Sequence, residues 1–255
     1  MLLAIDIGNT NITMGVFDGE RLVATWAVST DTKKTADEYA VLLTSLLSGS
    51  GLAFEDIDQI SIACVVPPLL ATIEDLCARY INNVHPLIVG PGIKTGVRIL
   101  MDNPREVGAD RIVNTAAAHR LYGGTVIVVD FGTATTFDVI SKNGDYLGGA
   151  IAPGIGIMAD ALFTRTSKLP TVELIAPEKT IGKNSVEAMQ SGIMFGYVGL
   201  IENLVTRIRK ELGEKAKVIA TGGLSVLFAS ETKIIDKVNK DLTLIGLRLI
   251  HEMNR

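Results

Sequence analysis

The chain of 255 residues contains the same supersecondary pattern twice. Residues 2–7 form an apolar run that holds Asp6 near its end and is followed by Gly8. A second apolar run ends in the same way at Asp130 and Gly132, so that both pairs are separated by 124 positions (130 − 6 and 132 − 8). A repeat of this length indicates two copies of one unit, here strand–strand–strand–helix.

Turn residues mark a hairpin inside each copy. Asp18-Gly19 separates the apolar runs 12–17 and 21–28, and Asn143-Gly144 precedes residues 146–152. Such dipeptides between apolar runs are strong hairpin signals, because they adopt the backbone angles of tight turns. We therefore expect each copy to begin with three antiparallel strands.

Periodicity predicts the remaining elements and the domain boundary. Helices are expected over 35–47, 67–80, 107–121, 155–163, 184–212 and 241–253, with one more after Gly222-Gly223, and strands over 60–66, 86–90 and 217–221. We place the boundary inside the helix at 107–121, which gives one domain over 1–115 and another over 116–255.

Composition excludes several classes of protein. Hydrophobic residues make up 47% of the chain, which is too many for a disordered protein. Apolar runs are interrupted before about 18 residues, and Asp6 stands where a signal peptide would carry bases, so neither a membrane span nor a leader is expected. With a net charge of −4, no nucleic-acid surface is predicted. Cys64 and Cys77 lack CxxC partners, which favours two buried thiols in a reducing cytoplasm and hence a soluble α/β protein.

The residues after the first apolar run suit a phosphate group. We expect Gly8 to adopt a positive φ, which lets main-chain N–H groups approach an anion closely. Asn9, Thr10 and Asn11 supply neutral donors, and Asp6 could hold Mg²⁺ directly or through water. One such corner could equally be a hairpin turn with a half-buried Asp that caps the backbone. Two copies, both followed by hydroxyl residues, favour a phosphate clamp.

Five motifs occur in order along the chain: DIGNT (6–10), GADR (108–111), DFGTATT (130–136), GGAIAPG (148–154) and TGG (221–223). Together they resemble type III pantothenate kinases, of the acetate kinase, sugar kinase, Hsp70 and actin superfamily. The resemblance covers nearly the whole chain. It implies a duplicated α/β fold, actin-like or ribonuclease-H-like, with two mixed sheets flanked by helices around a nucleotide cleft. It also implies ATP-dependent phosphorylation of pantothenate to 4′-phosphopantothenate, the first step of coenzyme A synthesis.

The resemblance implies roles for both corners. The residues around the ATP phosphates would be Asp6, Ile7, Gly8, Asn9, Thr10, Asn11, Ile12 and Thr13. Thr133 would contact the same nucleotide, and Asp130 would hold a monovalent cation, potassium or ammonium. Phosphoryl transfer depends on positioning and charge neutralisation, which such cations provide. The alternative for Asp130 is a turn cap, which we disfavour because it leaves a carboxylate at the cleft without a counter-ion.

The GADR segment is the candidate acceptor site. A kinase that acts on a primary alcohol benefits from a carboxylate that orients the hydroxyl and takes its proton. Asp110 suits this task, although by itself it could equally be a first-turn residue favoured by the helix dipole, with Arg111 a surface charge. The resemblance assigns Asp110 as the base and implies that Gly108, Ala109 and Arg111 contact pantothenate, whose carboxylate Arg111 could pair.

Two positions depart from the family pattern. Met101 stands two positions before Asn103-Pro104, where the family commonly has Tyr, so it keeps apolar contact but lacks a hydroxyl. Ser185 stands where the family usually has Thr, which contacts the substrate from the second subunit of a dimer. Ser retains the hydroxyl, so these departures bear on substrate affinity and leave the reaction type standing.

A second hypothesis is a nucleotide-binding regulatory or accessory protein of the same superfamily without a small-molecule acceptor. Such a protein has no need for Asp110 and Arg111 beside the nucleotide. A sugar or acetate kinase is disfavoured, because the chain lacks the insertions of those larger relatives. The apolar helix around 189–204 is either the interface of the homodimer that the resemblance implies or a buried core helix.

Overall fold

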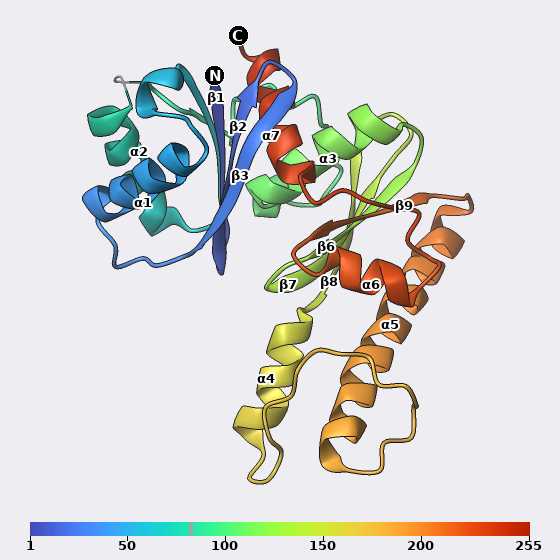
Figure 1. Ribbon diagram of the computed structural model, residues 1–255. Helices are drawn as coiled ribbons and strands as arrows, with labels where there is room; N and C mark the ends of the chain where they lie inside the picture. The colour runs from blue at the N-terminus through green and yellow to red at the C-terminus, as the bar shows by residue number, and fades with distance from the viewer. Residues whose placement is uncertain (82–83) are drawn as a thin grey trace. The chain divides into compact units, whose positions relative to one another are not determined.

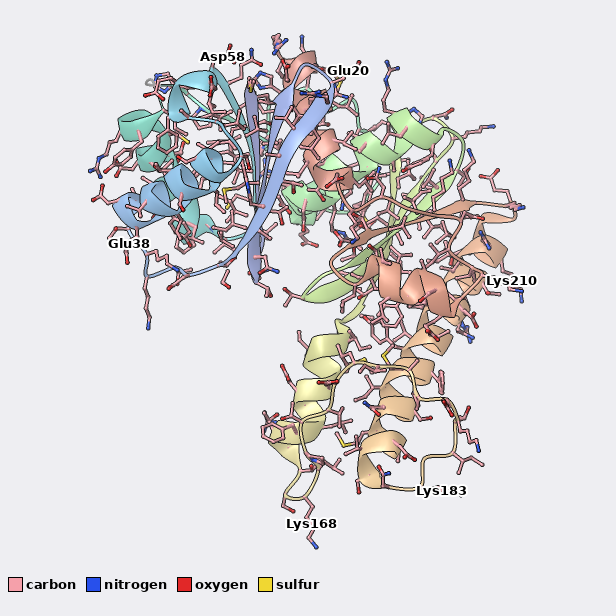
Figure 2. All side chains as sticks on the ribbon, viewed as in Figure 1. Glu20, Glu38, Asp58, Lys168, Lys183 and Lys210 are labelled. Carbon is pink, nitrogen blue, oxygen red and sulfur yellow. The ribbon has the colours of Figure 1, made fainter. Side chains whose placement is uncertain are left out.

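The computed structural model describes residues 1–81 and 84–255 and divides into two compact units (Figure 1). The first unit comprises Met1–Leu121 and Asp241–Arg255, and the second comprises Tyr122–Lys240. Each is built on one five-stranded sheet. Charged side chains such as Glu38 and Lys210 point away from their helices into solvent (Figure 2), which leaves the apolar faces for the sheets.

The first sheet has the strand order β3-β2-β1-β4-β5. Its strands are β1 (Leu2–Ile7), β2 (Asn11–Asp18), β3 (Arg21–Ser29), β4 (Gln59–Cys64) and β5 (Leu87–Ile88). The accompanying helices are α1 (Ala36–Gly49), α2 (Pro67–Tyr80), α3 (Ala109–Tyr122) and α7 (Leu242–Met253), with 3₁₀ turns at Phe54–Asp56 and Pro104–Glu106. The central strand β1 pairs antiparallel with β2 and parallel with β4.

Different helices cover the two faces of this sheet. Alternate side chains of a strand point to opposite faces. Leu3 and Ile5 therefore pack with α1 and α2, whereas Leu2 packs with Val113 of α3 and Leu247 of α7. Because β1 is buried on both faces, its sequence is apolar almost throughout.

The second sheet has the strand order β10-β9-β6-β7-β8. Its strands are β6 (Val126–Phe131), β7 (Ala134–Ile140), β8 (Tyr146–Pro153), β9 (Lys217–Gly222) and β10 (Lys237–Val238). The helices of this unit are α4 (Ile155–Arg165), α5 (Ser185–Leu212) and α6 (Ser225–Glu231). Phe131 of β6 stacks on Phe228 of α6, with 5.0 Å between the ring centroids.

The two sheets confirm the repeat. The order β3-β2-β1-β4-β5 matches β8-β7-β6-β9-β10, with the same antiparallel pairing on one side of the central strand and parallel pairing on the other. Asp6 lies opposite Thr13, and Asp130 lies opposite Thr136. Both carboxylates therefore occupy the same place in their units, one residue before the central strand ends.

The units differ from the expected ranges of 1–115 and 116–255 at two places. Helix α3 is not divided at 115, and the last helix, α7, belongs to the first unit. Close packing explains the second difference: a Cβ at Gly246 of α7 would lie only 2.3 Å from the main-chain oxygen of Val113 in α3. Glycine lets the two helices approach this closely.

Local signals account for several element ends. Thr35 caps α1, because its side chain accepts from the Glu38 amide while the Glu38 carboxylate accepts from the Thr35 amide. Pro67 opens α2, where the first amides need no partner. Gly213 ends α5 in the left-handed conformation, with φ 67°.

Helix α5 is a core helix on one side only. Met194, Tyr197 and Ile201 are fully buried in the second unit. On another side, Gly192 and Gly196 are exposed, and a Cβ added to either would meet no described atom within 4 Å.

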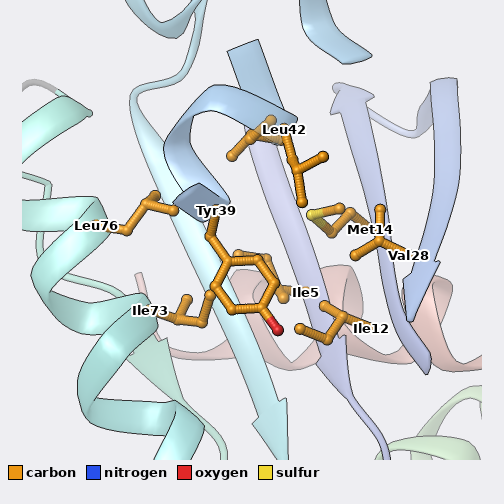
Figure 3. Close-up of a pocket in the computed structure, with 9 residues that line it drawn as sticks. Ile5, Ile12, Met14, Val28, Tyr39, Leu42, Ile73 and Leu76 are labelled. Carbon is orange, nitrogen blue, oxygen red and sulfur yellow. The ribbon is translucent and has the colours of Figure 1, made fainter. Parts of the chain in front are cut away.

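The space between the first sheet and its outer helices is closely packed (Figure 3). The ring of Tyr39 lies beside Ile5, Ile12 and Ile73, and the remaining cavity of about 10 Å³ is no larger than one water molecule. The Tyr39 hydroxyl donates to the carbonyl of Asp31 at 2.9 Å and accepts from its amide at 3.1 Å. This region is core and leaves no room for a ligand.

The cysteines are free, and only one matches the expectation of a buried thiol. Cys77 is buried, which raises the pKa of its thiol to about 12, whereas Cys64 is half-buried. Within the described ranges 1–81 and 84–255, none of the helices combines the length and apolar character needed to cross a bilayer.

Candidate active site

The first corner is the loop of residues 8–10, which joins β1 to β2. The amide of Gly8 donates to the carbonyl of Asn11 at 3.0 Å and closes the loop. Thr30, directly after β3, holds the loop from the side. Its hydroxyl donates to the Gly8 carbonyl at 2.6 Å, and its amide donates to the Thr10 carbonyl at 2.9 Å.

The expectation of a positive φ at Gly8 is wrong, and Gly132 does not adopt one either. Glycine is favoured at position 8 for a different reason. A Cβ there would lie 3.0 Å from the Asn11 carbonyl oxygen, which is tighter than most side chains tolerate. The close approach of two backbone segments is therefore the constraint at this corner, and the left-handed conformation is not.

The side chains of the first corner differ in their access to a ligand. Asn9, Thr10 and Asn11 are exposed and carry amide and hydroxyl groups. Ile7 and Ile12 are 0% and 1% exposed and belong to the core, so they could contribute only main-chain atoms.

Asp6 stands half-buried at the end of β1, opposite Thr13 on β2 and Ala63 on β4. Burial, together with the Asp6 charge, raises the pKa of the Cys64 thiol on the next strand. The thiol therefore stays protonated and is a poor nucleophile. The carboxylate of Asp6 is the group at this position suited to bind a hard cation.

The GADR segment begins α3 within the same unit. The Gly108 carbonyl accepts from the amides of Arg111 and Ile112 at 3.1 and 3.2 Å, and the Arg111 amide also donates to Oδ1 of Asp110 at 2.8 Å. Asp110 is thus held against the first turn of the helix. Its burial raises the pKa of the carboxyl group, and the Arg111 amide and charge only partly offset this.

Packing links Asp110 to the first corner. A Cβ at Gly108 would lie 2.5 Å from Oδ1 of Asp110 and 3.4 Å from Cγ1 of Val65. Val65 follows β4, and its amide donates to the Ile7 carbonyl at the end of β1 at 3.0 Å. A half-buried carboxylate therefore lies one packed residue away from the strand that leads into the candidate phosphate loop.

The two departures from the family pattern lie in different units. Met101 is half-buried in the loop before α3, and the following Asn103 is held by Glu106, whose carboxylate accepts from the Asn103 side chain at 2.8 Å. Ser185 is the exposed first residue of α5, after the N-cap Asn184.

The second corner is residues 132–133 between β6 and β7, one residue shorter than the first. A Cβ at Gly154 would lie 2.3 Å from the carbonyl oxygen of Thr133, and the Gly154 amide donates to that oxygen at 3.0 Å. On the other side, a Cβ at Gly222 of β9 would lie 2.6 Å from Oδ1 of Asp130. Two glycines therefore make room for Thr133 and Asp130.

Three supporting residues were not predicted from the sequence. Thr30 lies 22 residues from Gly8, and Gly154 belongs to the GGAIAPG motif, for which no contact with Thr133 was predicted. Val65 gave no signal, because it is one apolar residue in an apolar run. Neither spacing nor chemistry marked these positions, since their contacts arise only in the folded chain.

Across the described part of the chain, no group of three or more His, Cys, Asp or Glu side chains is arranged to hold a metal. Each corner instead offers one carboxylate beside main-chain groups and neutral donors. That arrangement fits a cation shared with phosphate oxygens, because the phosphate supplies the remaining ligands.

Solved structures with the same architecture identify the fold. A Campylobacter jejuni protein assigned to the Baf family of transcriptional activators matches with a TM-score of 0.63 and 22% identity, over 99% of this chain and 98% of that one. A ROK family glucokinase from Streptomyces griseus matches with a TM-score of 0.52 and 14% identity, over 99% of both chains. The fold is the duplicated actin-like fold of sugar kinases and related ATPases.

Sequence comparison then gives the family. A family model described as type III pantothenate kinase matches residues 2–207. Type III pantothenate kinases of Moorella thermoacetica and Geobacter sulfurreducens are 54% and 53% identical over 100% of both chains, and that of Dehalococcoides mccartyi strain BAV1 is 54% identical over 96% of its length. The chain belongs to the type III pantothenate kinase family.

The burial of Asp110 predicts that Asp110→Asn stabilises the fold at neutral pH. The folded chain raises the pKa of this carboxyl group and so binds its proton more tightly than the unfolded chain does. The ionised form therefore costs folding free energy above the raised pKa, and the cost disappears below about pH 4, where both states are protonated. Urea unfolding should show a higher midpoint for the variant at pH 7, and the gain should shrink toward pH 4.

Asp102→Asn serves as the control, because Asp102 is an exposed acid shortly before the same helix. Its midpoint should match that of the wild-type protein. Equal midpoints for Asp110→Asn and wild type at pH 7 would show that the ionised Asp110 carboxylate does not cost folding free energy.

Proposed function

We propose that this chain transfers the γ-phosphoryl group of ATP to the primary hydroxyl of pantothenate. The products are ADP and 4′-phosphopantothenate, in the first step of coenzyme A synthesis. The observation that carries the proposal is the packed link from the end of β1 through Val65 and Gly108 to Asp110. Family membership over the whole chain supports pantothenate as the substrate.

Residues Asp6 to Thr13 bind the phosphates of ATP. The exposed side chains of Asn9, Thr10 and Asn11 donate to phosphate oxygens without neutralising them. Ile7, Gly8 and Ile12 contribute main-chain groups. Mg²⁺, when bound with ATP, neutralises phosphate charge, and Asp6 is the residue that would hold it, directly or through water.

Asp110 is the general base. Its carboxylate accepts the proton of the pantothenate hydroxyl as the hydroxyl oxygen bonds to the γ-phosphorus and the bond to ADP breaks. Burial strengthens its basicity, because a raised pKa makes the carboxylate a better proton acceptor. The Arg111 amide orients the carboxylate by donating to Oδ1 at 2.8 Å.

Arg111 pairs with the pantothenate carboxylate through its planar guanidinium. Gly108 and Ala109 contact the substrate through the main chain at the start of α3. Met101 adds an apolar contact in place of the hydroxyl that the family usually has there. The absence of that hydroxyl affects substrate affinity more than turnover, because the hydroxyl does not take part in proton transfer.

In the second unit, Asp130 holds a monovalent cation, potassium or ammonium, and Thr133 contacts the nucleotide. The support is the match between the two corners: Asp130 occupies in β6 the place that Asp6 occupies in β1. We also propose that the protein acts in the cytoplasm, where the free thiols of Cys64 and Cys77 persist.

The protein works as a homodimer in which Ser185 contacts pantothenate bound to the other subunit. Exposed apolar side chains on α4 and just before α5 support an interface: Ile157 and Phe163 are 48% exposed, and Ile181 is 84% exposed. The exposed glycines of α5, Gly192 and Gly196, allow close approach of another chain.

Asp110→Asn should lower kcat by about 10²–10⁴-fold, because the hydroxyl proton then has no base to accept it. Steady-state assays with ATP, Mg²⁺, K⁺ and pantothenate measure this, with Asp102→Asn as the matched exposed control. If Asp110→Asn turns over at the wild-type rate, the assignment of the base is incorrect. If wild-type protein consumes ATP without regard to pantothenate, the acceptor is incorrect.

Gly222→Ala should displace the Asp130 carboxylate, because the added Cβ would lie 2.6 Å from its Oδ1 and φ at this position is +87°. We expect the K⁺ concentration for half-maximal activity to rise by about tenfold or more, a cost of at least about 1.4 kcal/mol. Gly223→Ala is the control, since a Cβ there meets no described atom within 4 Å. Equal K⁺ dependence in the two variants would remove Asp130 from the cation site.

Ile181→Asp should convert the dimer to a monomer and lower activity at the same protein concentration. Light scattering should give twice the chain mass for wild type and the chain mass for the variant. Val41→Asp, 70% exposed on α1 of the other unit, is the control and should remain dimeric. A monomeric, fully active wild-type protein would contradict the shared site.

A further inference from the structure

A polar cavity of about 150 Å³ lies at the end of β1 opposite the first corner, and the first unit alone forms it. Leu2, at the start of β1, lines the cavity, whereas Ile7 adjoins the corner. At about 3.3 Å per residue, the two places are roughly 15 Å apart. Both ends of the chain lie at this end of the unit (Figure 1), beside the residue Asp58 that Figure 2 labels.

Charged groups dominate the lining. Three are cationic and three acidic: the amino group of Met1, Arg248 and Arg255, and Asp18, Asp58 and Glu252. The side chain of Arg248 is only 9% exposed, whereas those of Asp58 and Glu252 are 69% and 39% exposed. The deepest charge is therefore a guanidinium, and the carboxylates stand nearer to solvent.

Arg248 has fewer acceptors than a buried guanidinium requires. Its Nη1 donates to Oε1 of Glu252 at 2.5 Å, and its Cζ lies 5.8 Å from the centre of the Phe17 ring. Its Nε is buried without a hydrogen-bond partner among the described residues. A guanidinium carries five N–H donors, and leaving buried donors unsatisfied is unfavourable.

Arg255 adds a second cation at the same cavity. It is exposed, its guanidinium donates to the side-chain oxygen of Gln59, and its charge helps to lower the pKa of the Asp58 carboxyl group. Two guanidinium groups thus line one cavity that has room for several water molecules at about 30 Å³ each.

We propose that this cavity binds a small oxyanion, a carboxylate or phosphate group, between Arg248 and Arg255. Planar guanidinium groups bind such oxygens through charge-assisted hydrogen bonds. An oxyanion gives the Arg248 guanidinium an acceptor besides Glu252. Glu252 competes with it, because its carboxylate already occupies Nη1 of Arg248.

Because Glu252 competes with the anion, replacing Glu252 and replacing Arg255 should change the anion affinity in opposite directions. Inorganic phosphate and malonate would be titrated calorimetrically into the full-length protein at pH 7.5 and constant ionic strength. Glu252→Gln should tighten binding by about fivefold to tenfold, since it removes a competing negative charge and frees Nη1. Arg255→Gln should weaken binding by about threefold to fivefold, the range for a solvent-exposed ion pair.

Arg79→Gln is the control, because Arg79 is an exposed cation on α2 of the same unit, away from the cavity. It should leave the affinity unchanged. Arg248→Lys keeps the charge but loses the planar guanidinium group. It should weaken the binding of both phosphate and malonate. If that variant fails to fold by circular dichroism, Glu252→Gln and Arg255→Gln still decide the question.

Three outcomes would overturn the proposal. The first is the absence of saturable binding below about 100 mM, far weaker than charge-assisted pairs should give, which would mean that the cavity holds only water. The second is an affinity that neither Glu252→Gln nor Arg255→Gln alters. The third is displacement of the anion by ATP, which would place it at the first corner.

Tighter binding of phosphate than of malonate would identify phosphate as the natural group, and the reverse order would identify a carboxylate.

Discussion

Each candidate corner depends on the central strand of its own unit, which is buried on both faces and hydrogen-bonded on both edges. β1 pairs with β2 and β4, and β6 pairs with β7 and β9. A shift of one residue in such a strand would turn every apolar side chain to the wrong face and break both sets of pairs. The end of the strand is therefore a fixed point. Asp6 and Asp130 lie one residue before those ends, so the strand register fixes their positions as well.

Parallel pairing of β1 and β4 places the GADR segment beside the end of β1. Because β1 and β4 run in the same direction, the residue after β4, Val65, lies beside the end of β1, and Gly108 packs against Val65. Asp110 is positioned in this way beside the loop proposed to bind phosphate. The same packing partly buries its carboxylate and raises its pKa, which costs stability and would favour the proton transfer proposed for it. The cavity at the other end of β1 also holds a group whose burial is unfavourable, because Nε of the buried Arg248 has no hydrogen-bond partner among the described residues.

Much of the fold could be predicted because its signals are local. The spacing of apolar residues and the turn at Asp18-Gly19 predict strands and hairpins within a residue or two of those observed. The identical interval from Asp6 to Asp130 predicts the duplicated sheet. The error at Gly8 has a physical cause. A glycine can serve either a left-handed φ or a close approach, and only the neighbouring Asn11 carbonyl decides between them.

By itself, the amino-acid sequence determined the elements, their duplication and the family, because each of these depends on residues close together in the chain or on the order of short motifs. The tertiary structure alone decided where Asp110 stands, why Gly154 and Gly222 carry no side chain, and that α7 returns to the first unit. These features arise from contacts between residues far apart in sequence, such as Gly246 with Val113. No periodicity or propensity records such contacts, because they exist only once the sheets and helices have packed.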